Sequence, residues 1–299
     1  MNQPNKLKIL NQWEQTWETA MGAWFPGERV LFRGKELLQE LNQLSWMELI
    51  LFGITGRQFQ PNQIKLFEAI WVISTSFPEP RLWNNRIATL AGTSRSTVNL
   101  GVSAGIAASE AIIFGHRPLL ATIDFLKKTQ QRLANGEVLT NLIKEALNAQ
   151  TRGRPGSGLN REVAKVPGFG RPITTNDERL QPLLTTAQNL GFTNGIHVLL
   201  AQRIEDALQQ QGHNLYMNVA TLMGALCADQ DLSPREYYHY VSLCFTGGLL
   251  PCAIDAQSKP EGAFFPLRCD RIKYQGPKKR QWKTNKSKPS DVDKTEITT

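Results

Sequence analysis

A glycine-rich turn near the middle of the chain carries residue types that can bind a ligand. Residues 166–179 read VPGFGRPITTNDER. The turn itself consists of Pro167, Gly168, Phe169 and Gly170. Its glycines lack a Cβ and tolerate positive φ, so the backbone can approach a ligand closely. Arg171 and Arg179 follow it, and a guanidinium is a fork of donors that suits carboxylate or carbonyl oxygens. By itself this pattern is typical of an ordinary connecting loop with solvated charges, and a turn that binds a ligand is the alternative.

Three further side chains are of types that take part in catalysis. They are His116, Cys252 and Asp255. Each has a structural alternative: a core histidine, a small buried hydrophobe and an ion pair. The four cysteines lack paired CxxC spacing and the histidines do not flank them in zinc-site order. We therefore expect reduced thiols and no metal.

Helical hydrophobic spacing dominates the elements that must position these groups. It predicts helices over residues 6–24, 35–44, 61–76, 97–114, 119–134, 138–149, 180–190, 197–211 and 217–228. Ser45 with Glu48, and Ser233 with Glu236, have the spacing of capping boxes that start two more helices. Residues 77–80 (FPEP) are interpreted as the start of a loop around Arg81, Trp83 and Arg86. No alternating strand series is evident, so the predicted fold class is all-α.

Charge and hydropathy limit the classes of function. The 299 residues are 41% hydrophobic, without a run long enough to span a membrane or an apolar secretory signal. We expect a soluble, cytoplasmic protein without a membrane partner. The net charge of +8 lies in residues 268–288, where nine basic residues accompany one acidic residue. A basic globular face for nucleic acid is therefore not predicted, and binding through this segment is a minor alternative.

Segments along most of the chain resemble the citrate synthase superfamily. The turn and the residues after it resemble that family's Gly-aromatic-Gly-His and its following Asp-Pro-Arg. Four further segments carry the resemblance: 32–37 (FRGKEL), 215–219 (LYMNV), 247–255 (GGLLPCAID) and 268–276 (RCDRIKYQG). It implies a large helical domain of residues 1–117 and 233–280, a small helical domain of 118–232, and a cleft between them. Residues 281–299 would form a disordered tail, and the helix over 97–114 a homodimer interface.

The resemblance also implies roles for individual residues. A coenzyme A (CoA) thioester would contact the turn, from Pro167 to Gly170, and His116 would bond the thioester oxygen. Arg171 replaces the second family histidine, and Ala220 stands where the family has the aspartate that removes a proton. A small carboxylate or oxo acid would be held by Arg179, Arg268 and Arg271. Asp255 falls at the family's glutamate and is the candidate replacement base.

Two functions follow as expectations. The first is a citrate-synthase-like or citryl-CoA-lyase-like acyltransferase that makes or breaks a carbon–carbon bond next to an acyl-CoA thioester. The second is an inactive relative that binds a ligand or partner as a dimer. Arginine stays protonated and an alanine cannot move a proton, so the family's usual proton transfers are not available at these two positions.

Overall fold

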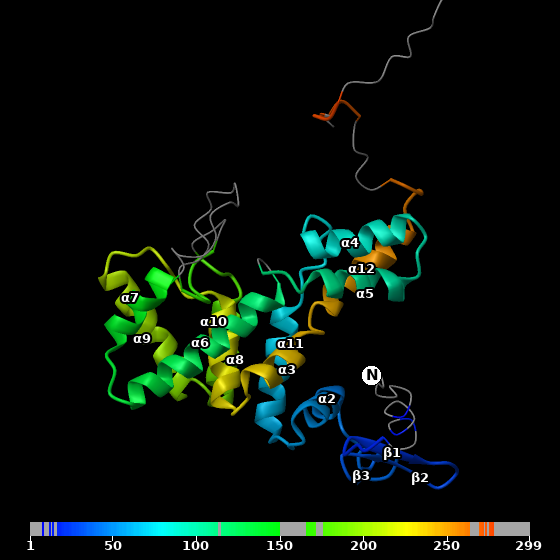
Figure 1. Cartoon of the computed structure of the whole chain (residues 1–299), viewed down its shortest axis with the longest axis horizontal. Coiled ribbons are helices and arrows are strands. Elements are labelled where there is room, and N and C mark those ends of the chain that lie inside the picture. The colour runs from blue at the N-terminus through cyan, green and yellow to red at the C-terminus, as the bar shows by residue number, and fades with distance from the viewer. Residues whose placement is uncertain are drawn as a thin grey trace, which may run out of the picture. The chain divides into compact units, whose positions relative to one another are not determined.

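A computed structural model of the chain describes residues 8, 12, 14, 17–112, 115–149, 166–171, 176–263, 269–271, 273 and 275–277. The chain divides into two compact units, residues 1–264 and 265–299. In the first unit, three strands precede a series of helices (Figure 1). The second contains a short 3₁₀ helix, Cys269–Arg271. The predicted large and small domains and the cleft between them stay predictions.

The elements of the first unit follow in chain order. The strands are β1 Gly22–Phe25, β2 Arg29–Phe32 and β3 Lys35–Glu36. The helices are α2 Trp46–Thr55, α3 Pro61–Ser74, α4 Trp83–Thr93, α5 Val98–Ala108, α6 His116–Ala134, α7 Leu139–Ala149, α8 Leu180–Leu190, α9 Ile196–Gln210, α10 Val219–Asp229, α11 Pro234–Val241 and α12 Thr246–Gln257. The all-α class is confirmed, apart from the small sheet. None of the helices within the described ranges is long and apolar enough to cross a membrane.

The predicted capping boxes are confirmed. The Ser45 hydroxyl accepts a hydrogen bond from the Glu48 N–H, and the Glu48 carboxylate accepts one from the Ser45 N–H. Ser233 and Glu236 do the same at the start of α11. Each box satisfies donors that the first helical turn leaves unpaired. These helix starts are therefore encoded locally.

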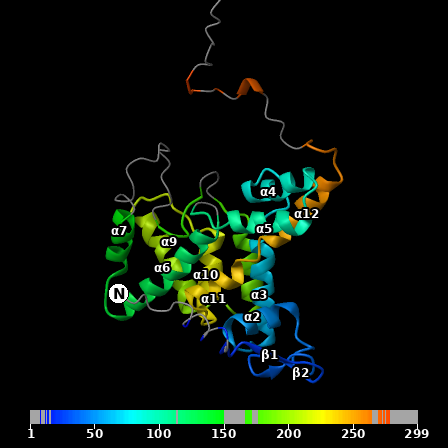
Figure 2. The ribbon, with the colours of Figure 1, turned by 45° about the vertical axis from the view of Figure 1, so that its right-hand side comes forward.

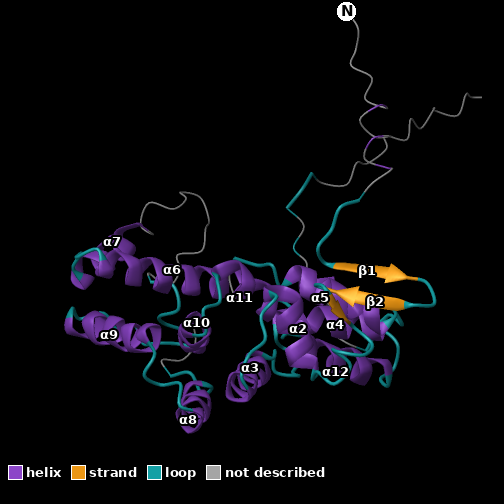
Figure 3. Cartoon of the chain, turned by 90° about the horizontal axis from the view of Figure 1, so that it is seen from below, coloured by secondary structure: helices purple, strands orange, loops and turns teal. Residues whose placement is uncertain are grey.

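The predicted helix over 35–44 is wrong, and the one over 6–24 is wrong at residues 17–24, whereas residues 8, 12 and 14 are helical. The three short strands form an antiparallel sheet, with Gly22 opposite Phe32 and Leu31 opposite Glu36 (Figure 3). Gly27 and Gly34 both have φ of +78°, so each reverses the chain where a helix would have to continue. Of residues 6–16, only 8, 12 and 14 are described.

Two helices, α4 and α12, were not predicted. They pack with α5 into a three-helix group (Figures 1 and 2). Gly92 of α4 leaves no room for a Cβ, because that atom would lie 2.5 Å from the Ala253 carbonyl oxygen of α12. Gly105 of α5 approaches Leu249 in the same way. The small residues Gly101, Gly105 and Ser109, spaced four apart, thus pack inside the chain, and the predicted dimer stays a prediction.

The main core lies around α10. Nine of its residues are buried, and it packs against α6 and α9. Thr221, Met223 and Cys227 are fully buried within it. This helix follows the Asn218 position directly, so the core fixes the segment that faces the glycine turn.

Candidate functional site

The glycine turn is held rigidly against the start of α10. Gly168 and Gly170 have φ of +85° and +89°, and the Phe169 side chain between them is fully buried. The Asn218 N–H donates to the Gly168 carbonyl at 3.0 Å, and the Gly170 N–H donates to the Tyr216 carbonyl at 2.6 Å. The prediction of a backbone turn that needs glycine is confirmed at both positions.

Asn218 joins the turn to the helix. Its side-chain nitrogen donates to the Gly170 carbonyl at 3.1 Å, and its side-chain oxygen accepts from the Ala220 N–H at 3.0 Å, which caps α10. Ala220 is half-buried in the first turn of this helix. The position where the resemblance places an aspartate is thus well ordered but carries only a methyl group.

Asp177 is the buried anchor of the segment after the turn. Its side chain is fully buried, and the Arg179 guanidinium donates two 2.9 Å hydrogen bonds to its two oxygens. The Val219 N–H donates a third, also at 2.9 Å. Burial alone would raise the pKa of Asp177, but the Arg179 guanidinium and the Val219 N–H hold that pKa below its usual value. Asp177 therefore stays ionised at neutral pH and fixes Arg179.

Arg171 lies next to Asp177 and is three-quarters buried. Its Nη1 atom donates to Glu178 at 2.6 Å and to the Asn176 carbonyl at 2.9 Å, and it lies 3.7 Å from Asp177. The Arg179 guanidinium lies 5.7 Å from the centre of the Phe77 ring. The structure thus brings Arg171 and Arg179 together around one carboxylate. Each already has an acidic partner in this state.

His116 is the first residue of α6, and only 1% of it is exposed. The ring of Phe245 stacks on its imidazole, with centroids 4.6 Å apart and planes inclined by 22°. Neither ring nitrogen has a hydrogen-bond partner among the described residues. Burial lowers the pKa of His116, and the nearby Glu110 carboxylate offsets part of that effect. At neutral pH the imidazole is therefore neutral, with two unsatisfied nitrogens.

Gly115 explains why His116 sits where it does. A Cβ at this residue would lie 2.2 Å from the Ser109 carbonyl oxygen, the same oxygen that accepts a 2.8 Å hydrogen bond from the His116 N–H. Only glycine allows this close contact between the end of α5 and the start of α6. Gly115 is therefore a local requirement of the fold, and it places His116 at the start of α6.

The other predicted residues lie apart from this group. Asp255 is exposed and forms an ion pair with Lys259 at 3.3 Å, ten residues beyond Phe245, which is about 15 Å of helix. Cys252 is buried, and burial raises the pKa of its thiol. Arg268 lies outside the described residues, and Arg271 belongs to the second unit. In the described part of the chain, no group of three or more metal-binding side chains is found.

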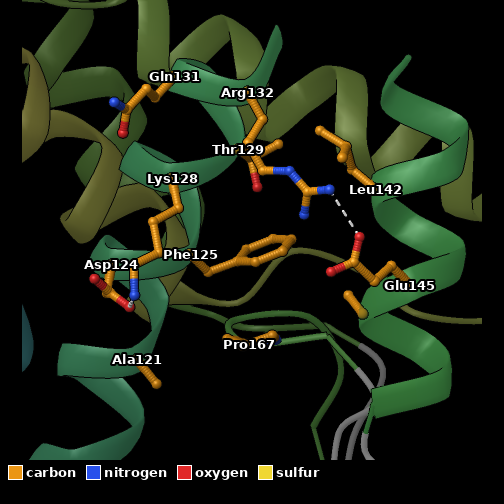
Figure 4. Close-up of a pocket in the computed structure, with 11 residues that line it drawn as sticks. Ala121, Asp124, Phe125, Lys128, Thr129, Gln131, Arg132, Leu142, Glu145 and Pro167 are labelled. Atoms are coloured by element: carbon orange, nitrogen blue, oxygen red, sulfur yellow. Dashed lines mark hydrogen bonds and ion pairs between the residues drawn. The ribbon is translucent and has the colours of Figure 1, made fainter. Parts of the chain in front are cut away.

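A pocket of about 440 Å³ opens between α6 and α7 beside Pro167 of the glycine turn (Figure 4). Its apolar surface comes from Phe125, Leu142, Ala146 and Pro167. Two ion pairs lie at its edge: Lys128 with Asp124 at 2.7 Å, and Arg132 with Glu145 at 2.8 Å. Figure 4 shows the Phe125 ring between these pairs. The pocket suits a flat apolar group with polar substituents at its rim.

Comparison with known proteins defines the fold. Citryl-CoA lyase from Hydrogenobacter thermophilus matches 89% of this chain and 96% of its own, with 20% identity and a TM-score of 0.73. ATP citrate lyase from Methanosaeta concilii, in complex with (3S)-citryl-CoA, matches 92% of this chain with 17% identity and a TM-score of 0.68. Citrate synthase from Thermotoga maritima matches 80% of this chain with 14% identity and a TM-score of 0.57. The chain therefore has the citrate synthase-like fold, as its sequence motifs implied.

The chain spans less than half of the ATP citrate lyase, 45% of its length. No protein-family model matches the chain, and no curated protein matches its sequence significantly. The comparisons thus establish the fold.

Sequence reasoning missed two acidic residues that contact the site. Asp177 gave a weak signal, because it stands two residues before Arg179 in a stretch that resembles Asp-Pro-Arg. Glu110 gave none, since its contacts with Tyr238 and Arg117 come from different helices. Such contacts become visible only in three dimensions.

Proposed function

We propose that this protein binds an acyl-CoA thioester and makes or breaks the carbon–carbon bond next to the thioester. The observation that carries the proposal is His116, a buried neutral imidazole at the start of α6 whose two nitrogens have no hydrogen-bond partner among the described residues. Unsatisfied buried polar groups are costly, so a site that retains one has a use for it. The complex of the Methanosaeta concilii lyase with (3S)-citryl-CoA supports the class of ligand.

The pocket beside Pro167 would take the nucleotide end of CoA. The face of an adenine matches the apolar surface of Phe125, Leu142 and Ala146, and Lys128 and Arg132 could exchange their carboxylate partners for phosphates. Ala121 at the near edge of the pocket is five residues from His116, about 8 Å along the α6 axis. A CoA arm that follows α6 would bring its thioester to the imidazole.

Arg171 and Arg179 would hold the carboxylate or carbonyl oxygens of the second reactant. Each is a permanent cation, and Asp177 fixes the Arg179 guanidinium by two hydrogen bonds. An incoming carboxylate would replace Glu178, which is 60% exposed, as the partner of Arg171. The identity of the small acid or oxo acid, and the homodimer, remain expectations of the same proposal.

Calorimetric titration with CoA tests the binding site. Ala146→Phe is expected to weaken CoA binding at least tenfold, because the larger ring fills the pocket. Ala134→Phe is the matched control: it adds the same ring at the exposed end of α6, outside the residues that line the pocket, and should leave affinity unchanged. Equal CoA affinity in the two variants would contradict this placement of the nucleotide.

The second candidate is an inactive relative that binds an acyl-CoA without turnover. Ala220 favours it, because the position where the resemblance places the base has no group that can take a proton, and positioned proton transfer contributes about 10²- to 10⁴-fold. Exchange of α-protons of bound acyl-CoA esters into deuterated water separates the two candidates. We expect exchange that His116→Ala abolishes; CoA binding without exchange would favour the inactive relative.

A further inference from the structure

Glu110 is the acidic residue that faces His116. Its Oε1 atom lies 3.6 Å from Nδ1 of the imidazole, slightly longer than a hydrogen bond. The same oxygen accepts a hydrogen bond from the Tyr238 hydroxyl of α11. Its other oxygen, Oε2, lies 3.2 Å from Nε of Arg117. Glu110 is therefore held by a hydrogen bond from α11 and an ion pair from α6, with the histidine as its third neighbour.

Two aromatic rings restrict how the imidazole can turn. Phe245 stacks on it at 4.6 Å, and Tyr238 meets it edge-on at 6.5 Å with planes 89° apart. The side chain of His116 is 1% exposed, so there is little space for another rotamer. With Nδ1 facing Glu110, the opposite nitrogen Nε2 faces away from that carboxylate.

The carboxylate determines which nitrogen carries the proton. An ionised carboxylate only accepts hydrogen bonds, so a neutral histidine beside it carries its hydrogen on the near nitrogen, Nδ1. Nε2 then has a lone pair. It cannot donate to a thioester oxygen, but it can accept a proton, as the histidine of a carboxylate–histidine pair does in hydrolases.

We propose that His116 is the general base that replaces the carboxylate missing at Ala220, and that Glu110 is its positioning residue. This rests on the proposed function, since the substrate is an acyl-CoA thioester. In the step, the bond between the α-carbon and its hydrogen breaks, the proton bonds to Nε2, and the electron pair moves onto the thioester oxygen to give an enolate. Glu110 balances the positive charge that forms on the imidazole.

The electrostatic surroundings agree with this role. Burial lowers the pKa of His116, which keeps the ring in the neutral form that accepts a proton at pH 7. Among the described residues, Glu110 from the connection between α5 and α6 lies beside Nδ1, Tyr238 from α11 lies edge-on to the ring, and Arg117 from α6 pairs with the other oxygen of Glu110. The hydrogen bond to Glu110 raises the pKa of Tyr238, so its hydroxyl remains a donor.

Nuclear magnetic resonance of the full chain labelled with ¹⁵N-histidine tests the tautomer without any substrate. The chain has four histidines, and His116→Gln identifies the signals of interest. We expect a protonated Nδ1 and an unprotonated Nε2. Glu110→Gln should shift the population toward the Nε2–H tautomer, whereas Glu261→Gln, which removes an exposed carboxylate paired with Arg95, should not. Protonated Nε2 in the wild type would overturn the proposal.

Proton exchange from acetyl-CoA tests the base itself. A glutamine at residue 116 can donate a hydrogen bond to a thioester oxygen but cannot accept a proton, so exchange should fall to background in His116→Gln as it does in His116→Ala. Glu110→Gln should lower exchange on the order of 10²-fold. It should also move the acid limb of the remaining rate to lower pH, because losing the negative charge lowers the pKa of His116.

The outcomes separate this inference from the function on which it rests. Absence of CoA binding by calorimetry would contradict the proposed function as well. CoA binding with exchange that survives in His116→Gln would overturn the base and leave the binding site standing. Bound acetyl-CoA that does not exchange in the wild type would also overturn the base.

Discussion

At the scale of single residues, Asp177 is the side chain whose substitution we expect to change the free energy of unfolding most clearly. Asp177→Asn keeps the shape of the side chain but removes the charge that pairs with Arg179. Breaking a buried ion pair from one side typically costs about 3–5 kcal/mol, and the remaining amide oxygen keeps some hydrogen bonding. We expect a loss of about 3 kcal/mol in the free energy of unfolding at pH 7, measured by urea denaturation.

The stability difference between wild type and Asp177→Asn should depend on pH in a way that identifies the ionised carboxylate as its cause. The pKa of Asp177 is lowered in the folded state, so its contribution is present above the pKa of the unfolded chain and declines as pH falls through the folded value. The gap between wild type and Asp177→Asn should therefore narrow below about pH 4. Glu178→Gln, which removes the 60% exposed partner of Arg171, should cost less than about 1 kcal/mol. Similar losses in both variants would contradict the buried anchor.

Gly168 allows a second matched comparison. A Cβ at this residue would lie 2.1 Å from Thr221 Oγ1 and 2.7 Å from a Thr122 methyl, while Gly191 has nearly the same φ and open space. Both alanine variants have the cost of a left-handed backbone, about 1–2 kcal/mol. We expect Gly168→Ala to lose about 1–3 kcal/mol more than Gly191→Ala in thermal unfolding, because only the former overpacks the core. Equal losses would show that the turn moves freely.

At the scale of elements, the sequence predicted those helix starts that are stabilised by hydrogen bonds between neighbouring residues. The boxes at Ser45 and Ser233 place two helix starts, because their hydrogen bonds close within four residues. Helix α12 was not predicted, because Pro251 and two glycines lie inside it and disfavour a helix locally. Packing against α4 stabilises this helix. The three-stranded sheet was not predicted, because the apolar spacing of its sequence also fits a helix. The sequence signal for the sheet is the pair of glycines, Gly27 and Gly34, that take positive φ at its two turns.

Helix α9 shows a cap supplied from outside its own sequence. The Asp229 carboxylate, at the end of α10, accepts hydrogen bonds from the N–H groups of His197 and Val198. Gly195→Ser would place a favoured N-cap residue there, yet its Cβ would lie 1.9 Å from Asp229 Oδ2. We expect Gly195→Ser to destabilise the protein by about 1–3 kcal/mol in chemical denaturation. Combined with Asp229→Ala, it should cost less than the sum of the two changes, and strict additivity would count against this cap.

At the scale of the whole molecule, the site depends on segments far apart in the sequence. His116 opens α6, its stacking partner Phe245 precedes α12, and the glycine turn rests on the start of α10. The sequence motifs implied the fold and pointed to the turn and to His116. The hydrogen bond that holds Glu110 beside the histidine could not be predicted, since its donor, Tyr238, lies 128 residues away in the sequence. The proposed replacement for the carboxylate missing at Ala220 therefore follows from contacts in the folded chain, which the sequence motifs do not contain.

The basic segment at the end of the chain tests whether the molecule has a separate, charge-driven activity. Deleting residues 277–299 removes seven basic and three acidic residues and lowers the net charge from +8 to +4. Because residues 1–264 form a compact unit, we expect CoA affinity and the melting temperature to stay unchanged. If the six basic residues within 278–288 all contacted duplex phosphates, log affinity would fall with log salt at a slope of about 5 in the full chain, and the deletion would abolish that dependence. A loss of CoA binding on deletion would instead assign the segment to the thioester site.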